Sequence, residues 1–453
     1  MIAAATAPTP DFSSAKPRAR DLHLLRTERG AHAFVVDGSQ LFDIDEETFA
    51  ELDAAIDGPD LDSKLANLGL RCGPRRIDDA APEHMPVRAL SLAVAQKCNL
   101  GCTYCYAREG DFGGPAKNMS LETARAAVDL LFAETEPDQR INLAFLGGEP
   151  LINRAVLRST TEYAHAQASR RGQRIGFSIT TNGTLLTPED CDFFERFSFA
   201  VTVSLDGSRA NHDRQRPFKG GRGSFDVIIR RLKPLLAKQV AMQATARVTV
   251  TPENLDLRET LDELLALGFY SVGFSPMLAS PTGAGQMQGA SLATMLENMV
   301  SCGHEFERRV LRGETYAFAN LMTALQEIHR GTHRPYPCGA GGGYFGVSAD
   351  GDLSACHRFV GDHVGDMGHI ATGVDRSRQA TWLRSRHVHT QLPCNSCWAR
   401  YLCGGGCHHE VLAGGRHACD FIRGWLHYCL QAYLRLSAVR PDMFAQLAAA
   451  HSH

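Results

Sequence analysis

The sequence predicts an α/β fold between residues 90 and 311, in which helices cover a parallel sheet. Six short apolar runs alternate there with six amphipathic segments, and this alternation is typical of repeated strand–helix units. In the first amphipathic segment, Ser120 is placed to cap a helix whose apolar face carries Leu121 and Val128. The expected strands are 90–95, 141–146, 174–181, 199–205, 244–251 and 270–277, and the expected helices are 121–133, 152–170, 188–196, 224–237, 255–267 and 291–311.

A small α+β unit is expected before this sheet. Apolar runs at 22–25, 33–36 and 41–44 predict short strands separated by turns, and Asp45 then caps a helix. Residues 1–20 are rich in Ala, Pro and Ser and lack the basic and apolar regions of a secretory signal, so they predict a flexible tail.

Charge and cysteine content narrow the range of functions. The chain has 453 residues, enough for two or three domains, with 47 Lys and Arg against 50 Asp and Glu. This near balance gives no electrostatic reason to expect a nucleic acid or an anionic membrane as a partner, and no apolar run is long enough to span a bilayer. The 14 cysteines, without a secretory signal, favour metal ligation in a reducing cytoplasm over a disulfide scaffold.

Three cysteines follow the first expected strand on one short loop. Cys98, Cys102 and Cys105 form a C-x3-C-x2-C pattern. Three thiols cannot all pair with one another, and soft thiolates crowded on one loop suit an iron–sulfur cluster or zinc. A closed zinc site or a fully ligated cluster needs a fourth ligand, and none is evident in this loop. A zinc loop and three buried thiols are the alternatives.

The pattern resembles the cluster loop of the radical S-adenosylmethionine (radical SAM) superfamily, including the aromatic Tyr104 before the last cysteine. The resemblance implies a partial (β/α)6 barrel, open on one side, with its active site at the carboxyl ends of the strands. It also implies a four-iron, four-sulfur (Fe4S4) cluster on Cys98, Cys102 and Cys105, whose fourth iron binds S-adenosylmethionine (AdoMet).

Residues that the resemblance assigns to AdoMet lie at or near the ends of the later strands. The Gly147-Gly148-Glu149-Pro150 loop resembles the family's segment for the methionine amino group, because glycines allow close approach and a carboxylate suits an ammonium. Hydroxyls and carboxylates at later strand ends suit the ribose, and an arginine in the fifth strand suits the cofactor carboxylate. Helix capping is the alternative role for such polar residues. The candidates are Thr181, Asn182, Ser204, Asp206 and Arg247.

Seven cysteines towards the C-terminus resemble the SPASM extension of radical SAM enzymes that modify peptides. Asp350-Gly351 predicts a hairpin turn that brings Cys338 and Cys356 towards one place. The resemblance implies two auxiliary Fe4S4 clusters with interleaved ligands, and a zinc ribbon is the alternative. Cluster I would use Cys338, Cys356 and Cys407, and cluster II would use Cys394, Cys397, Cys403 and Cys419.

Cluster I is expected to have an open iron, because no further cysteine lies between Cys338 and Cys356. Cys429 is the alternative fourth ligand. A helix would place it about 15 Å along its axis from Cys419, too far to share the cluster of that residue. Three histidines beside ligands are candidates for hydrogen bonds to the clusters or for surface positions: His357, His408 and His409.

The expected organisation is a tail over residues 1–20, a unit over 21–87, a radical SAM barrel over 88–312, a linker over 313–337 and a SPASM domain over 338–453. The second of these resembles the peptide-recognition element of peptide-modifying enzymes, which binds a leader peptide by strand addition. Simple packing against the barrel is the alternative.

The resemblance implies a radical enzyme that modifies a peptide or small protein with cysteines and a leader segment, using a reductant such as flavodoxin or ferredoxin. The loop from Gln96 to Gly114 most resembles enzymes that form cysteine thioethers, in particular those that mature the small subunit of quinohemoprotein amine dehydrogenase. The alternatives are carbon–carbon cross-linking, sulfatase-type formylglycine formation, and a non-enzymatic iron–sulfur or zinc scaffold.

Overall fold

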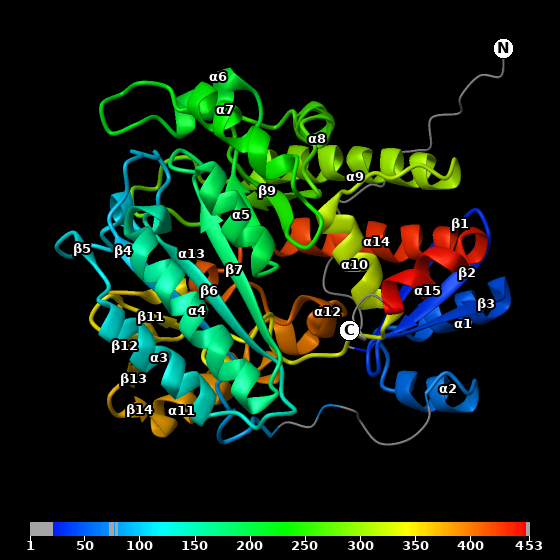
Figure 1. Ribbon diagram of the computed structural model, residues 1–453. Helices are drawn as coiled ribbons and strands as arrows, with labels where there is room; N and C mark the ends of the chain where they lie inside the picture. Colours follow the sequence, from blue (N-terminus) through cyan, green and yellow to red (C-terminus); the bar gives the residue numbers. More distant parts are fainter. Residues whose placement is uncertain (1–20, 72–76, 78–79, 450–453) are drawn as a thin grey trace, which may run out of the picture.

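The N-terminal unit is a small antiparallel sheet followed by two helices (Figure 1). The computed structural model describes residues 21–71, 77 and 80–449, so the tail predicted over residues 1–20 lies outside it. Asp45 accepts a hydrogen bond from the backbone N–H of Thr48 at 2.7 Å and begins helix α1, as predicted. The elements are β1 (Leu22–Thr27), β2 (Gly30–Val35), β3 (Gln40–Ile44), α1 (Glu46–Ala55) and α2 (Leu61–Asn67).

The second sheet contains the six parallel strands predicted from the sequence. Neighbouring strands pair in parallel in the order β10-β9-β8-β7-β6-β4. Alternate residues of β9 are buried, as Ala246 and Val248 are, whereas Arg247 between them points to the opposite face. The strands are β4 (Ala89–Gln96), β6 (Ile141–Gly147), β7 (Ile175–Thr181), β8 (Ala200–Ser204), β9 (Gln243–Val250) and β10 (Ser271–Pro276), and a short β5 (Lys117–Asn118) pairs with β4.

Helices cover the outer face of this sheet (Figure 1). The region expected to be a linker instead contains helix α10, because Leu321, Leu325 and Ile328 recur at helical spacing and are buried. Asn320 also ties α10 to β10 through two hydrogen bonds with the backbone of Phe274, at 2.8 and 2.9 Å. The helices are α3 (Leu121–Ala133), α4 (Arg154–Arg171), α5 (Pro188–Arg196), α6 (Arg209–Gln215), α7 (Phe225–Leu236), α8 (Leu257–Ala266), α9 (Gly289–Leu311) and α10 (Ala319–His329).

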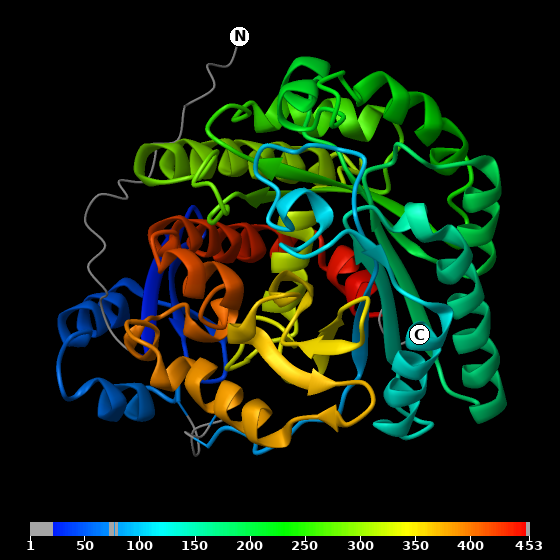
Figure 2. The same ribbon diagram turned by 90° about the vertical axis from the view of Figure 1, so that its left-hand side faces the viewer.

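The C-terminal region continues the barrel sheet, which the sequence does not predict. Strand β11 pairs in parallel with β4 and antiparallel with β12, around the predicted turn at Gly351, whose φ is +102°. Figure 2 shows this region, yellow to red, on the side of the sheet away from the outer helices. Its elements are β11 (Tyr344–Val347), β12 (Asp352–Ser354), β13 (Asp366–His369), β14 (Gly373–Val374), α11 (Arg376–Arg386), α12 (Arg400–Cys403), α13 (His408–Gly414), α14 (Cys419–Val439) and α15 (Pro441–Ala449).

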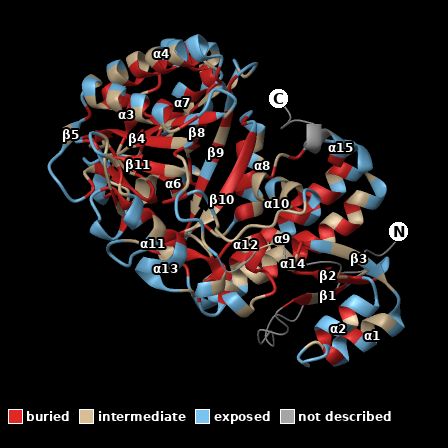
Figure 3. Ribbon diagram, turned by 90° about the horizontal axis from the view of Figure 1, so that it is seen from below, coloured by how far each residue is buried: buried red, intermediate tan, exposed pale blue. Residues whose placement is uncertain are grey.

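The N-terminal unit packs on the C-terminal region rather than on the outer helices (Figure 1). The ring of His23 on β1 stacks on Trp398 with 3.8 Å between centroids, and Asp21 forms a buried ion pair with Arg400. Figure 3 shows the buried residues concentrated along the strands and on the inward faces of the helices. No helix within the described ranges combines the length and apolar character needed to cross a lipid bilayer.

Candidate active site

The cluster loop, residues 98–105, leaves strand β4 at the carboxyl edge of the sheet, as predicted. A second loop holds it in place through backbone hydrogen bonds. The N–H of Gly101 donates to the carbonyl oxygen of Pro217 at 2.8 Å, and that of Thr103 donates to the carbonyl oxygen of Gln215 at 3.0 Å. The position of the loop is therefore set by a segment more than a hundred residues away in the chain.

The three thiols of the cluster loop lie close enough to affect one another's ionisation. Burial, helped by the charges of the neighbouring thiols, raises the pKa of Cys98 to about 11 and that of Cys102 to about 12. Cys102 and Cys105 also line a surface cleft together with Pro281 and Thr282, from the loop between β10 and α9. Such thiols keep their protons at neutral pH unless a cation displaces them, as a metal does on binding.

The Gly147-Gly148 segment packs so closely on the end of β4 and on Lys97, just before the cluster loop, that a side chain does not fit. A Cβ at Gly147 would lie 2.2 Å from a backbone oxygen of β4, and one at Gly148 would lie 2.3 Å from the oxygen of Lys97. Gly110, with φ at +97°, closes the contact from the other side, where its Cβ would meet that of Cys98 at 2.7 Å. The predicted close approach of Gly147 and Gly148 is thus an approach to the backbone that leads into the cluster loop.

Glu149 is fully buried, and both of its carboxylate oxygens accept hydrogen bonds. The Thr181 hydroxyl donates to Oε1 at 2.8 Å, and the Asn182 backbone N–H donates to Oε2 at 2.7 Å. Burial raises the pKa of Glu149 to about 7, against the effect of these hydrogen bonds. The carboxylate joins the ends of β6 and β7 and positions Asn182, whose Nδ2 lies 3.7 Å from Cys98 Sγ.

Asp206, Arg216 and Tyr104 form a buried cluster beside Cys102. Arg216 Nε donates to Asp206 at 2.8 Å, the Tyr104 hydroxyl donates to the same carboxylate, and the backbone N–H of Thr249 donates to its other oxygen at 2.9 Å. The guanidinium carbon of Arg216 lies 5.2 Å from the centre of the Tyr104 ring. This arrangement fixes the aromatic ring that the sequence predicts beside the cofactor.

Arg247 is an exposed residue on the face of β9 opposite Ala246 and Val248, and it lies near enough to Glu410 and Arg358 of the C-terminal region for their charges to affect it. Strand register pairs it with Ser204 at the end of β8, and its Nη1 lies 3.9 Å from the position that a Cβ at Gly273 would occupy. Surrounding protein atoms lower the pKa of Arg247, and the charge of Glu410 opposes this change. Among the described residues, Arg247 has no hydrogen-bond or ion-pair partner. Pro150, the last AdoMet candidate, is buried at the start of a short turn.

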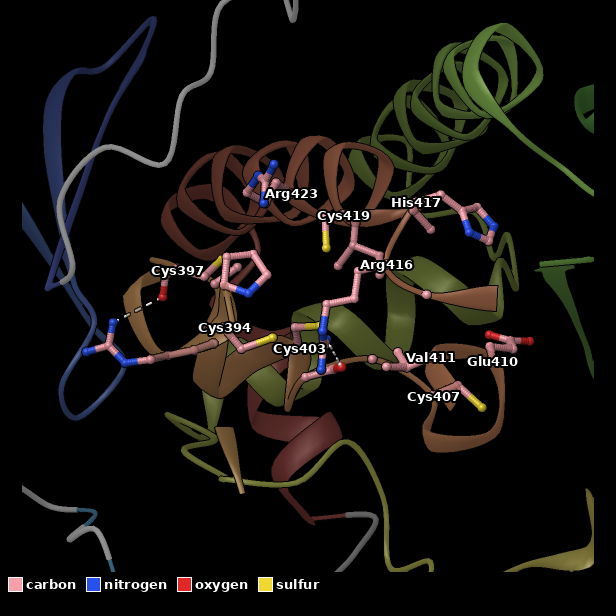
Figure 4. Close-up of a pocket in the computed structure, with 18 of the residues that line it drawn as sticks. Cys394, Cys397, Cys403, Cys407, Glu410, Val411, Arg416, His417, Cys419 and Arg423 are labelled. Carbon is pink, nitrogen blue, oxygen red and sulfur yellow. Dashed lines mark hydrogen bonds between the residues drawn. The ribbon is translucent and has the colours of Figure 1, made fainter. Parts of the chain in front are cut away.

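The C-terminal cysteines form two separate groups. Three of them lie close enough for the charge of one thiol to raise the pKa of another. These are Cys338, Cys356 and Cys407, hereafter group I. The other four form group II and line one pocket. Cys407 also lines this pocket, but its sulfur is directed away from the four (Figure 4). These are the two sets that the predicted interleaved ligation requires. Group II consists of Cys394, Cys397, Cys403 and Cys419.

Buried hydrogen-bond donors near both groups fit an anionic cluster. Arg358 Nη1 lies 3.9 Å from Cys407 Sγ. Arg386 lies close enough to Cys394 and Cys407 for their charges to raise its pKa, against the effect of burial. Within the described part of the chain, Arg358 Nε, Arg386 Nη2 and His408 Nε2 have no hydrogen-bond partner. Buried donors are nearly always paired, and cluster sulfurs accept such hydrogen bonds. Thiols and donors together therefore fit an Fe4S4 cluster at each group.

Cys429 is separated from both groups. It is fully buried on α14, and the charge that affects its pKa is that of Glu307 rather than that of any other thiol. Among the described residues, no three His, Cys, Asp or Glu side chains meet closely enough to hold a single metal ion. Ligands of a four-iron cluster surround a larger volume than ligands of one ion.

Four polar residues of this region are absent from the sequence-based prediction. Tyr106, Arg358 and Glu410 each lie within three residues of a candidate ligand, which is the signal that points to them. Arg216 has no such signal, because it lies at the end of α6, far from every cysteine in the sequence. The fold alone brings it beside Cys102.

Comparison with known proteins agrees with this geometry. Residues 92–275 match the sequence model of the Radical SAM superfamily. The chain is 26% identical over 345 residues to the serine-type anaerobic sulfatase-maturating enzyme of Klebsiella aerogenes. The alignment covers 74% of this chain and 82% of that protein. It is 31% identical over 156 residues to the cysteine-type anaerobic sulfatase-maturating enzyme of Clostridium novyi, over 33% of this chain and 41% of that protein.

Solved structures show the same fold. The structure of anSMEcpe with bound AdoMet aligns with a TM-score of 0.67 at 20% identity and covers 81% of this chain and 98% of that one. Streptococcus suis SuiB, bound to its precursor peptide SuiA, aligns with a TM-score of 0.51 at 14% identity and covers 89% of this chain and 99% of that one. The chain therefore has the α/β fold of radical SAM proteins, with a cysteine-rich C-terminal region.

Proposed function

Because residues 92–275 form a radical SAM domain, we propose that the chain is a radical SAM enzyme that modifies a peptide or protein. The observation that carries the proposal is the close grouping of Cys98, Cys102 and Cys105 at the carboxyl edge of the barrel. A reduced Fe4S4 cluster that binds AdoMet supplies a 5′-deoxyadenosyl radical able to abstract hydrogen from carbon. The protein contributes ligands, orientation and exclusion of water.

Residues at the carboxyl edge have distinct proposed roles. The three thiolates hold the cluster, and the glycines packed on the cluster loop keep it in position. Arg247 is an unpaired cation inside the barrel, so it suits the carboxylate of AdoMet, with Ser204 beside it for the ribose. Asp206 acts mainly by holding Arg216 and Tyr104, since protein donors already occupy its oxygens.

The leading product is sulfatase-type formylglycine, made by oxidation of a cysteine or serine side chain. Support comes from the sulfatase-maturating relatives of both the serine and the cysteine type. After hydrogen abstraction, the substrate radical must lose one more electron. The two auxiliary groups supply sites for clusters that accept it, and flavodoxin or ferredoxin is the proposed reductant for the barrel cluster.

A cysteine thioether is the second candidate product, with the small subunit of quinohemoprotein amine dehydrogenase as a specific substrate. One observation favours it: group I has three cysteines, and Cys429 lies away from them in the core. An Fe4S4 cluster with three protein thiolates has an iron free for a fourth ligand. A substrate thiolate bound there would be held close to a neighbouring carbon radical.

The N-terminal unit is the proposed binding site for a leader segment. Among the described residues, strand β3 pairs with β2 alone, so its other edge is available for strand addition. The structural likeness to SuiB with its precursor peptide supports a peptide as the substrate.

Mass spectrometry of treated peptides separates these products. The reconstituted enzyme is incubated under anaerobic conditions with AdoMet, dithionite and either a sulfatase-derived peptide or a cysteine-containing precursor peptide. Formylglycine appears as an aldehyde that reacts with hydrazine, and a cysteine peptide loses its sulfur. A thioether keeps the sulfur, loses two hydrogens and no longer reacts with iodoacetamide. Unchanged peptides, despite formation of 5′-deoxyadenosine, would contradict both products.

A further inference from the structure

Arg358 lies beside group I and close to Tyr106, the residue that follows the cluster loop. Its Nη1 lies 3.9 Å from Cys407 Sγ, and its guanidinium carbon lies 5.3 Å from the ring centre of Tyr106, the residue after Cys105. The side chain is only 16% exposed, so its charge acts in surroundings that screen it weakly. A fixed positive charge therefore lies beside Cys407 and close to the residue that follows the cluster loop.

A carboxylate accompanies this charge. Arg358 Nη1 donates to Glu410 Oε1 at 2.7 Å, and the side chain of Glu410 is 17% exposed. Glu410 lies on α13, one turn after Cys407, so both charges of the pair lie beside the same proposed cluster. Among the described residues, Arg358 Nε is buried without a hydrogen-bond partner, which leaves one N–H group free for a cluster sulfur.

We infer that the Arg358–Glu410 pair sets the reduction potential of the cluster held by group I, an inference that rests on the proposed function. Reduction adds negative charge to a cluster that is already anionic. A nearby guanidinium, and an N–H that donates to sulfur, stabilise the reduced form and raise the potential, whereas a carboxylate lowers it. The two members of the pair therefore shift the reduction potential in opposite directions.

The inferred role matters for the second half of the reaction. The carbon radical of the substrate loses one electron to the group I cluster, which becomes more negative by one unit of charge. For a serine, the hydroxyl proton leaves to water and the carbonyl forms. For a cysteine, loss of the thiol proton gives a thioaldehyde, which water hydrolyses to the aldehyde with release of sulfide. For a thioether, the thiol proton leaves to water as the sulfur bonds to the neighbouring carbon. Arg358 favours this electron transfer by stabilising the reduced cluster, so it acts through the cluster as a positioning residue.

The test is a redox titration monitored by electron paramagnetic resonance. Cys98, Cys102 and Cys105 are first changed to alanine, so that only the auxiliary clusters contribute signals. In this background, Arg358→Gln should shift the group I potential to more negative values, and Glu410→Gln should shift it to more positive values. The double variant should lie near the parent protein. The group II signal should not move in any of these variants, which makes it an internal control.

Arg26→Gln is the matched control, because Arg26 also pairs with a glutamate, Glu46, at 2.7 Å, but in the N-terminal unit. It should leave both potentials unchanged. Iron analysis shows whether each variant retains its clusters. If Arg358→Gln loses iron, its potential cannot be compared with that of the parent protein. Glu410→Gln then tests the inference on its own, because the inference requires it to raise the potential of the group I cluster.

Two outcomes would overturn the inference: an unchanged group I potential in Glu410→Gln, or shifts of the same sign in both single variants. The proposed function is tested separately in the protein with an intact barrel loop. There, Arg358→Gln should still cleave AdoMet with dithionite but give less modified peptide per 5′-deoxyadenosine. Absence of AdoMet cleavage in the unmodified protein would reject the proposed function, whatever the potentials are.

Discussion

Two tyrosines flank Cys105, and each is covered by an arginine that pairs with a carboxylate. Tyr104 lies beside Arg216 and Asp206, and Tyr106 lies beside Arg358 and its partner Glu410. The distances from guanidinium carbon to ring centre are almost the same, 5.2 Å for Tyr104 and 5.3 Å for Tyr106. The two arrangements thus use the same three kinds of side chain on opposite sides of one cysteine.

Their surroundings differ. Asp206 is fully buried and its oxygens accept hydrogen bonds from Arg216, Tyr104 and a backbone N–H, so this pair is locked inside the barrel. Arg358 and Glu410 come from the C-terminal region, remain partly exposed, and leave one buried N–H of Arg358 unpaired. The comparison indicates that the first pair holds the cluster loop in place, whereas the second retains capacity to interact with a cluster.

The three groups of cysteines should hold their clusters independently of one another. Three Fe4S4 clusters imply about twelve irons per chain after anaerobic reconstitution. Cys394→Ala together with Cys397→Ala should remove about a third of this iron, because group II is separate from group I and from the cluster loop. Iron and sulfide analysis measures this. Loss of all iron from the double variant, or zinc in place of most iron in the unmodified protein, would break the comparison.

Breaking the buried pair should cost more stability than breaking the partly exposed one. Asp206→Asn leaves Arg216 as an uncompensated buried charge and should destabilise the protein by about 3–5 kcal/mol. Glu410→Gln should cost less, since Arg358 keeps some access to water. Asp226→Asn, which breaks an exposed pair with Arg209, is the control and should change the free energy of unfolding by less than about 1 kcal/mol. Urea unfolding of the three variants would contradict the account if their order were reversed.

The tight contact between Gly110 and Cys98 should contribute both to stability and to AdoMet binding. Gly110→Ala places a Cβ 2.7 Å from that of Cys98 at a positive φ, so it should cost about 1–3 kcal/mol and weaken AdoMet binding. Gly220→Ala is the matched control, because nothing lies within 4 Å of its Cβ position and its φ is not positive. Calorimetric titration with AdoMet compares the two, and equal affinities would show that the contact at Gly110 does not matter.

The smallest expected effect is a pH dependence where the N-terminal unit meets the C-terminal region. Burial lowers the pKa of His23 from 6.5 to about 3, and His427 adds to this decrease. A group with a depressed pKa in the folded protein contributes stability above its unfolded pKa, and this contribution is lost as pH falls from about 6.5 towards 3. His23→Phe keeps a ring against Trp398 but cannot be protonated. Its melting temperature should therefore fall less with acid than that of the unmodified protein, and identical pH profiles would contradict this assignment.

Local patterns account for the part of the molecule that the sequence predicts. The six barrel strands and the cluster loop can be read from periodicity and from cysteines only a few residues apart. The pairing of β11 with β4 joins residues about 250 positions apart, and the hairpin pattern carries no information about it. Arg216 is likewise brought to Cys102 by the fold alone. Side-chain contacts between distant segments depend on packing, which periodicity does not encode.

Glu149 shows the same limit at a single residue. Its motif predicts a carboxylate facing an ammonium, but the structure also gives it three hydrogen-bond donors from its own chain, including the backbone N–H of Leu151 at 3.1 Å. The motif identifies the residue, and the hydrogen bonds reveal that it joins two strand ends beside Cys98.

Reductive cleavage of AdoMet shows whether Cys98, Cys102 and Cys105 hold the radical-generating cluster. The reconstituted protein, incubated with AdoMet and dithionite without oxygen, should form 5′-deoxyadenosine and methionine. The variant with Cys98, Cys102 and Cys105 changed to alanine should form neither, while it keeps about eight irons on its auxiliary groups. Formation of 5′-deoxyadenosine by this variant, or its absence from the unmodified protein with a full complement of iron, would contradict the assignment of the cluster loop as the radical-generating site.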